Sequence, residues 1–187
     1  MTALESTDAA DARSGMHIRA ARETDVAAIL GLIRELAVYE KLLHEVDATE
    51  ANIHQSLFGA VPRAHADIAE WNGGIAGLAL WFYNYSTFRG RAGIYLEDLF
   101  VLPAFRGKGL GKALIARLAQ RCVDENLPRL QWQVLDWNTP SIEFYRSLDA
   151  NLMSEWITCR MGEPAIAALA TSYPPFERKP DENQTSP

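Results

Sequence analysis

The spacing of apolar residues predicts a short strand and two helices at the start of the chain. Residues 17–21 read as a strand, and the apolar positions that follow recur every three or four residues, which predicts a helix over about 26–39. We expect Thr24 to cap this helix. Thr49 and Gly59 mark the expected start and stop of a second, shorter helix.

The middle of the chain reads as a hairpin followed by a further strand. Residues 66–71 and 75–85 are apolar segments joined by Asn72-Gly73-Gly74, which is a strong turn signal. The second arm is too apolar for an edge strand and should lie inside the sheet. Residues 94–101 predict a mostly buried strand.

Helices and strands alternate in the late part of the chain. Thr139 and Pro140 suit the cap and first turn of one of these helices, and Pro164 suits the first turn of another. The predicted helices cover 110–126, 139–148 and 163–170, and the predicted strands cover 130–135 and 156–161. This order predicts a single α/β domain with a mixed central sheet flanked by helices.

Length and charge narrow the possibilities. A chain of 187 residues that is 48% hydrophobic can bury one substantial core. We expect one domain over 16–171, a disordered leader over 1–15 and a disordered tail over 172–187, with translation starting at Met1 or Met16. A net charge of −6 argues against nucleic acid as the main partner and suits a cationic substrate.

Several other classes of protein lack support in the sequence. The two cysteines lie far apart and the four histidines show no metal-ligand spacing, so neither a disulfide framework nor a metal site is indicated. The leader is small and acidic, unlike a signal peptide, and no apolar run is long enough to cross a membrane. We therefore expect a cytoplasmic protein with no membrane partner.

A glycine-rich stretch, Arg106 to Lys112, lies between the strand at 94–101 and the helix that follows; we call it the cradle. The first amides of a helix have no internal partners, the helix dipole is positive there, and glycines let phosphate oxygens approach the backbone. Arg106 and Lys108 add positive charge. The cradle is therefore predicted to bind a pyrophosphate.

The spacing of the glycines separates this cradle from two common phosphate motifs. Gly107, Gly109 and Gly111 give G-x-G-x-G, which fits neither the dinucleotide fingerprint nor the nucleotide P-loop. Arg106, Gly109 and Gly111 do match Arg-x-x-Gly-x-Gly, and this resembles the coenzyme A motif of the GNAT superfamily of N-acetyltransferases. A basic, glycine-rich turn without a ligand is the simpler alternative.

Narrower signatures resemble one branch of that superfamily, the diamine (spermidine/spermine) and thialysine N-acetyltransferases. They are Tyr95-Leu96-Glu97-Asp98, Leu135-Asp136-Trp137-Asn138, Phe144-Tyr145, the segment 35–40 and the loop 85–91. The resemblance covers roughly residues 16–170. It implies the GNAT fold, acetyl-CoA as co-substrate, a small primary amine as acceptor and a homodimer.

The resemblance also implies roles for individual residues. Tyr145 and Glu97 would be catalytic. Acetyl-CoA would be bound by Leu99, Phe100, Val101, Arg106, Gly107, Lys108, Gly109, Leu110, Gly111, Lys112, Asn138 and Ser141. The acceptor amine would be bordered by Tyr39, Glu40, Glu97, Asp98 and Glu155.

The reaction itself asks for such groups. A primary amine with a pKa of about 10.4 arrives as an ammonium ion and must lose a proton before it attacks a thioester. Glu97 could take that proton through water, and Tyr145 could protonate the departing thiolate. Backbone amides of the central strand could stabilise the oxyanion. No metal is required.

Each assignment has a structural alternative. Tyr145 could be a packed residue of its helix, and Tyr39 and Glu40 could simply end theirs. Glu97 and Asp98 alternate across a strand, so both can face one pocket only if the strand is bulged.

Departures from the family pattern leave the acceptor open. Ser86 and Phe88 stand where diamine acetyltransferases carry aspartate and tryptophan, which weakens the case for long polyamines. Asp149 stands where the family favours glycine. A lysine-like amino acid and a short polyamine therefore both fit, and a protein amine or a non-catalytic acyl-CoA sensor are the competing functions.

Overall fold

The computed structural model describes residues 15–172, which form two compact units divided between Leu135 and Asp136. The first unit holds a five-stranded sheet in the order β1-β2-β3-β4-β5. Its strands are β1 (Met16–Ala20), β2 (His65–Trp71), β3 (Gly74–Ser86), β4 (Arg91–Val101) and β5 (Leu130–Gln131). Neighbouring strands are antiparallel except β4 and β5, which are parallel, so the predicted mixed sheet is confirmed.

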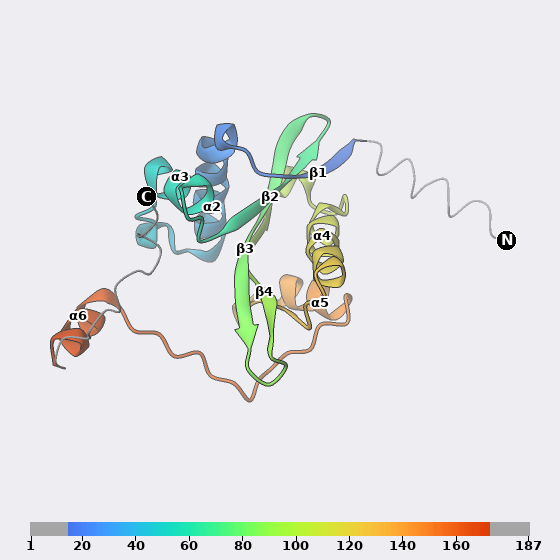
Figure 1. The fold of residues 1–187 in the computed structure, drawn as a ribbon. Coiled ribbons are helices and arrows are strands. Elements are labelled where there is room, and N and C mark those ends of the chain that lie inside the picture. Colours follow the sequence, from blue (N-terminus) through green and yellow to red (C-terminus); the bar gives the residue numbers. More distant parts are fainter. Residues whose placement is uncertain (1–14, 173–187) are drawn as a thin grey trace, which may run out of the picture. The chain divides into compact units, whose positions relative to one another are not determined.

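Helices cover both faces of this sheet (Figure 1). The helical elements of the first unit are η1 (Glu23–Asp25), α2 (Val26–Glu40), η2 (Leu43–Glu45), α3 (Glu50–Phe58), η3 (Pro103–Phe105) and α4 (Leu110–Asp124). On one face, α2 and α3 bury Ile29 and Leu57 against Ile68, Leu78 and Phe100 of the strands. The apolar stripe of α4, which includes fully buried Leu114 and Leu118, packs on the other face.

Local signals fixed several element boundaries correctly. The Thr49 side chain accepts a hydrogen bond from the backbone amide of Asn52, so it caps α3 as predicted. Asn72 and Gly73 adopt positive φ angles of 50° and 80°, which is the conformation that a tight two-residue hairpin turn requires. Asp149 has a φ of 59° and thus takes the left-handed position where the family favours glycine.

The predicted cap at Thr24 is wrong, because a different residue organises this turn. Thr24 lies inside η1, and Asp25 is the residue before α2. The Asp25 carboxylate accepts a hydrogen bond from the Arg22 backbone amide at 2.7 Å. This bond links the two ends of the turn over residues 22–25.

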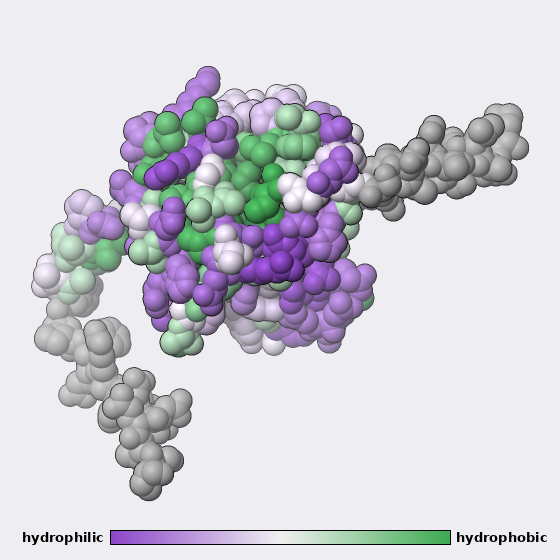
Figure 2. Space-filling model, turned by 90° about the horizontal axis from the view of Figure 1, so that it is seen from above, coloured by the Kyte–Doolittle hydropathy of each residue, from purple (hydrophilic) through white to green (hydrophobic). Residues whose placement is uncertain are grey.

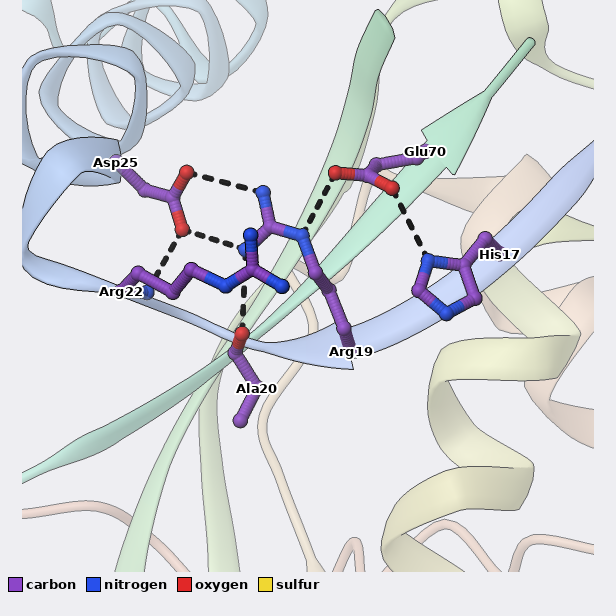
Figure 3. A network of polar contacts seen from close by, with 6 residues as sticks. All are labelled: His17, Arg19, Ala20, Arg22, Asp25 and Glu70. Atoms are coloured by element: carbon purple, nitrogen blue, oxygen red, sulfur yellow. Dashed lines mark hydrogen bonds and ion pairs between the residues drawn. The ribbon is translucent and has the colours of Figure 1, made fainter. Parts of the chain in front are cut away.

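Asp25 is also one end of a polar network that ties β1 to its neighbours (Figure 3). Arg19 donates to both carboxylate oxygens of Asp25, at 2.6 and 3.0 Å, and to Glu70 of β2 at 2.7 Å. His17 contacts the second oxygen of Glu70 at 3.0 Å. The hydrogen bond from Arg19 is the main reason that the pKa of Asp25 lies below its usual value.

Replacing Arg19 with methionine is expected to lower the free energy of unfolding by about 3 kcal/mol at pH 7, because it strands a buried carboxylate. The pKa of Asp25 is depressed in the folded state, so this stabilisation is present at neutral pH and is lost as the pH falls through that pKa. Urea unfolding at pH 7 and pH 3 should show a smaller deficit at the lower pH. Arg146→Met is the control, because it removes an exposed ion pair with Glu143 and should cost less than about 1 kcal/mol.

The second unit holds α5 (Thr139–Arg146) and α6 (Glu163–Thr171). Asn138, and not the predicted Thr139, caps α5, since its side chain accepts from the amide of Ser141. The strand predicted over 156–161 is absent: these residues lie in no helix or strand, and all are exposed. The strand predicted over 130–135 is reduced to the two residues of β5.

Two further predictions concern the ends of the chain and its surface. The predicted leader and tail lie outside the described residues except for Gly15 and Ser172. Within residues 15–172, no helix is long and apolar enough to cross a membrane. Seen from above, apolar side chains reach the surface in the middle of the view and polar ones surround them (Figure 2).

Candidate active site

One edge of β4 is unpaired over the residues expected to contact coenzyme. β3 pairs with β4 along its whole length, whereas β5 pairs only with Ile94 and Tyr95 on the opposite edge. No other described strand continues that pairing toward Val101. The backbone groups of residues 99–101 can therefore receive an extended ligand as if it were an added strand.

This open edge leads directly into the cradle. Gly107 and Gly109 adopt left-handed φ angles of 77° and 85°, and Gly109 is the residue before α4. Glycine has no side chain with which to cap a helix, so the first amides of α4 remain available to a ligand. Gly107, Lys108 and Gly109 are exposed. The loop ahead of α4 is therefore exposed where the sequence predicts an anion site, and its binding of a pyrophosphate stays a prediction.

Two of the three cations of the cradle, Arg106 and Lys108, lie over aromatic rings. The Arg106 guanidinium lies 4.8 Å from the ring centroid of Tyr39 and 5.5 Å from that of Phe100, and its Nε donates to the Val101 carbonyl at 3.0 Å. The Lys108 ammonium lies 5.0 Å from the Trp71 ring. Arg106 therefore joins the end of α2 to the end of β4, a role that sequence spacing did not reveal.

β4 contains the β-bulge that Glu97 and Asp98 need if both are to face one pocket. Leu80 of β3 faces Asp98 and the next residue, Trp81, faces Leu96, so Glu97 is the extra residue of β4. A bulge interrupts the alternation of side chains and lets neighbouring residues turn toward the same region. Glu97 is exposed and Asp98 is half-buried.

Asp98 lies in an acidic environment that includes the end of α2. Burial, followed by repulsion from Glu97 and Glu40, raises the pKa of Asp98 to about 6. Burial also raises the pKa of Glu40. The structure thus brings three of the predicted acceptor-site carboxylates into one electrostatically coupled group, which we call the carboxylate cluster: Glu40, Glu97 and Asp98.

The remaining predicted site residues belong to the second unit. Asn138 and Ser141 are joined at the start of α5 by the capping hydrogen bond of 3.3 Å. Tyr145 is on the same helix and is buried. Glu155 is exposed in a turn outside any helix or strand. Their roles toward coenzyme and acceptor remain predictions.

Metal ligation finds no candidate within residues 15–172, where no group of three or more His, Cys, Asp or Glu side chains is placed to hold an ion. The bulge at Glu97 could not be predicted from the sequence. Its one signal there is a pair of consecutive acidic residues, Glu97 and Asp98, in a strand that is otherwise apolar.

Known proteins resemble this chain over most of its length. Residues 21–149 match the Acetyltransferase (GNAT) family. A thialysine N-epsilon-acetyltransferase from Bos taurus is 37% identical over 164 residues, covering 82% of this chain and 96% of the relative. An L-ornithine N5-acetyltransferase from Arabidopsis thaliana is 29% identical over 197 residues, covering 81% and 86%.

Solved structures share the fold. The structure of AAC(6')-Iy in complex with a bisubstrate analogue of coenzyme A and acetylneamine aligns with a TM-score of 0.65 at 23% identity, covering 80% of this chain and 99% of that one. The family match spans both the open edge of β4 and the cradle. The chain belongs to the GNAT family and is an acetyl-CoA-dependent N-acetyltransferase.

Proposed function

We propose that the protein acetylates the side-chain amine of a small diamino acid of the lysine, thialysine or ornithine type. The observation that carries the proposal is the carboxylate cluster beside the open edge of β4, because carboxylates attract an ammonium group to the strand that would hold the thioester. The relatives named above support it, since their names specify the side-chain amines of thialysine and ornithine. A short polyamine is the second candidate, favoured by a 31% identical spermidine/spermine acetyltransferase-like relative from Homo sapiens.

Coenzyme would bind in two parts. The backbone of Leu99, Phe100 and Val101 would pair with the pantetheine arm, and the amides from Gly107 to Lys112 would hold the pyrophosphate. Asn138 and Ser141 would contact coenzyme from the start of α5. These contacts would present the acetyl carbonyl to the amine and leave the bulged backbone of β4 available to the oxyanion.

Proton removal would be the task of Glu97 and Asp98. At pH 7.4 only about one molecule in a thousand of an amine with a pKa near 10.4 is neutral, so a base near the amine has a large effect. The exposed Glu97 would receive the proton through water, and Asp98 would share it, since the two carboxylates are coupled. Tyr39, Glu40 and Glu155 would border the acceptor.

Turnover of a panel of amines tests the acceptor. Release of free coenzyme A from acetyl-CoA should be fastest with lysine, thialysine or ornithine, and slower with putrescine, spermidine and peptides that carry a free amine. Fastest turnover with peptides would overturn the proposal in favour of a protein amine. Tight binding of acetyl-CoA with no turnover of any amine would favour a non-catalytic sensor.

Replacing Tyr145 with phenylalanine is expected to lower kcat about tenfold while the KM for acetyl-CoA changes little. The hydroxyl would protonate the departing thiolate, but a thiolate whose conjugate acid has a pKa near 8.5 can also leave unaided, so the loss should be moderate. Tyr85→Phe, at an exposed tyrosine of β3, is the control. Full turnover in Tyr145→Phe would leave Tyr145 as a packed residue only.

We also propose that the protein forms a homodimer. Trp156 and Ile157 are neighbours in a segment with no helix or strand, and their side chains are 71% and 88% exposed. Adjacent large apolar side chains that are exposed to solvent are typical of a protein–protein interface. Sedimentation velocity should give a molecular mass twice that of one chain. In Ile157→Asp the measured mass should fall toward that of a single chain. A wild-type protein that sediments as a single chain at micromolar concentration would contradict the proposal.

A further inference from the structure

A pocket of about 150 Å³ lies in the first unit where β1 ends, and it shares no residue with the cradle or the carboxylate cluster. His65 and Asp67 of β2, Trp81 and Tyr83 of β3 and Arg121 of α4 form its polar and aromatic part. Small apolar residues of β1 and the apolar end of α3 form the rest of its wall. The reaction proposed above uses none of these side chains.

Asp67 lines this pocket and has an unsatisfied oxygen. The residue is only 1% exposed, and its Oδ2 accepts a hydrogen bond from the Trp81 indole N–H at 2.9 Å. Its Oδ1 is buried and receives no hydrogen bond from any described residue. The Arg117 Nε lies 3.9 Å from Oδ1, which is too far for a hydrogen bond. A buried carboxylate oxygen without a donor is costly, and it marks a place where a ligand donor would be stabilised.

Arg121 lines the same pocket and has a buried hydrogen-bond donor without an acceptor. Its guanidinium lies 4.8 Å from the centroid of Trp81 and donates through Nη1 to Glu125 at 3.1 Å. Its Nε is buried and has no acceptor among the described residues. Glu125 is held in turn by the Tyr83 hydroxyl, which donates to it at 2.7 Å. The pocket therefore combines one unsatisfied acceptor with one unsatisfied donor.

The charges around the pocket are balanced. Arg117 and Arg121 are positive, and Asp67 and Glu125 are negative. Two further titratable groups line the pocket, His65 and Tyr83. His65 stacks on Trp81 at 4.5 Å, and burial together with Arg121 lowers its pKa; burial raises the pKa of Tyr83. A cationic ligand would be repelled by the two arginines, and an anionic ligand by the two carboxylates. A ligand with separated charges of both signs would not.

We propose that this pocket binds a small zwitterion, an α-amino acid with a short apolar side chain. Asp67 Oδ1 and Arg121 Nε are buried, so both side chains turn toward the ligand as it binds. The ligand's ammonium group then donates to Asp67 Oδ1, and its carboxylate accepts from Arg121 Nε. Its side chain lies against the apolar wall, where Leu57 and Phe58 end α3. This site is additional to the acceptor site on β4, and its occupation does not require acetyl-CoA.

The Trp81 indole N–H reports on the site directly, because it donates to the carboxylate that binds the ligand. The sequence has five tryptophans, so the indole region of a ¹H–¹⁵N spectrum of the full-length protein is simple, and Trp81→Phe assigns the resonance. Titration with L-alanine and L-valine should shift this resonance saturably. Methylamine and acetate, each of which carries one of the two charges, should not saturate it at the same concentrations.

Two variants test the chemistry of the site. Asp67→Asn keeps the shape and the acceptor for Trp81 but loses the charge, and should weaken alanine binding at least tenfold; it also shifts the Trp81 resonance, which gives a second assignment. Asp124→Asn, at an exposed residue of α4, should leave binding unchanged. A Trp81 resonance that does not respond to either amino acid, or equal binding by Asp67→Asn, would mean that water alone satisfies these atoms and would overturn the proposal. The titration contains no coenzyme, so its result is independent of the amine panel.

Discussion

Replacing Asp98 with asparagine is expected to lower kcat/KM for the amine by about a hundredfold at pH 7.5, within the range that general bases contribute. The wild-type rate should rise with pH through an apparent pKa of about 6, because the carboxylate accepts a proton only when it is ionised. Asp98→Asn should remove this limb of the profile. Initial rates of coenzyme A release between pH 5 and 9 provide the measurement.

Glu97→Gln separates the two carboxylates. Repulsion from Glu97 helps to raise the pKa of Asp98. In Glu97→Gln the rise of the rate with pH should therefore occur at lower pH, and the rate itself should fall. Glu143→Gln, at an exposed residue of α5, should leave both the rate and the profile unchanged. A wild-type profile that is flat between pH 5 and 7, or an unchanged profile in Asp98→Asn, would exclude Asp98 from proton transfer.

The double substitution Gly107→Ala and Gly109→Ala is expected to weaken coenzyme A binding about a hundredfold. Both glycines are left-handed, and a side chain makes that conformation unfavourable by about 1–2 kcal/mol per residue. The loop would relieve this strain by rotating its amides away from the phosphates, and a charge-assisted hydrogen bond is worth about 1.5–3 kcal/mol. Isothermal titration calorimetry with coenzyme A measures the change.

Gly73→Ala and Gly90→Ala together form the matched control. These glycines are also left-handed, with φ angles of 80° and 61°, and an added Cβ meets nothing within 4 Å at either. Both double variants should therefore lose similar free energies of unfolding, but only the cradle pair should lose affinity. Equal affinity in the two double variants would show that the cradle does not hold the pyrophosphate.

Local chemistry allowed much of the fold to be predicted from sequence. Thr49 and the turn at Asn72 and Gly73 act through their own backbone neighbours, and both predictions are confirmed. The predicted cap at Thr24 failed because Asp25 is drawn into contacts with Arg19, which is close in space through β1. Strand pairing is also a tertiary property, so the apolar residues at 156–161 could suggest a strand but could not supply its partner.

The site shows the same division between local and tertiary features. The glycine spacing of the cradle is local, and the left-handed angles at Gly107 and Gly109 follow from it. The bulge at Glu97 depends on the register between β3 and β4, which no pattern within β4 specifies. The contact of Arg106 with Tyr39 joins residues 67 positions apart and could not be read from either motif. The raised pKa of Asp98 is also a tertiary property, because burial and Glu40 of α2 contribute to it.

The unpaired edge of β4 has a consequence for handling the coenzyme-free protein. Bare backbone amides and carbonyls on a strand are a template for any other extended chain, including the same edge of another molecule. Bound acetyl-CoA should therefore cover this edge and prevent such pairing. Protein stored without acetyl-CoA should form intermolecular β-structure and precipitate sooner.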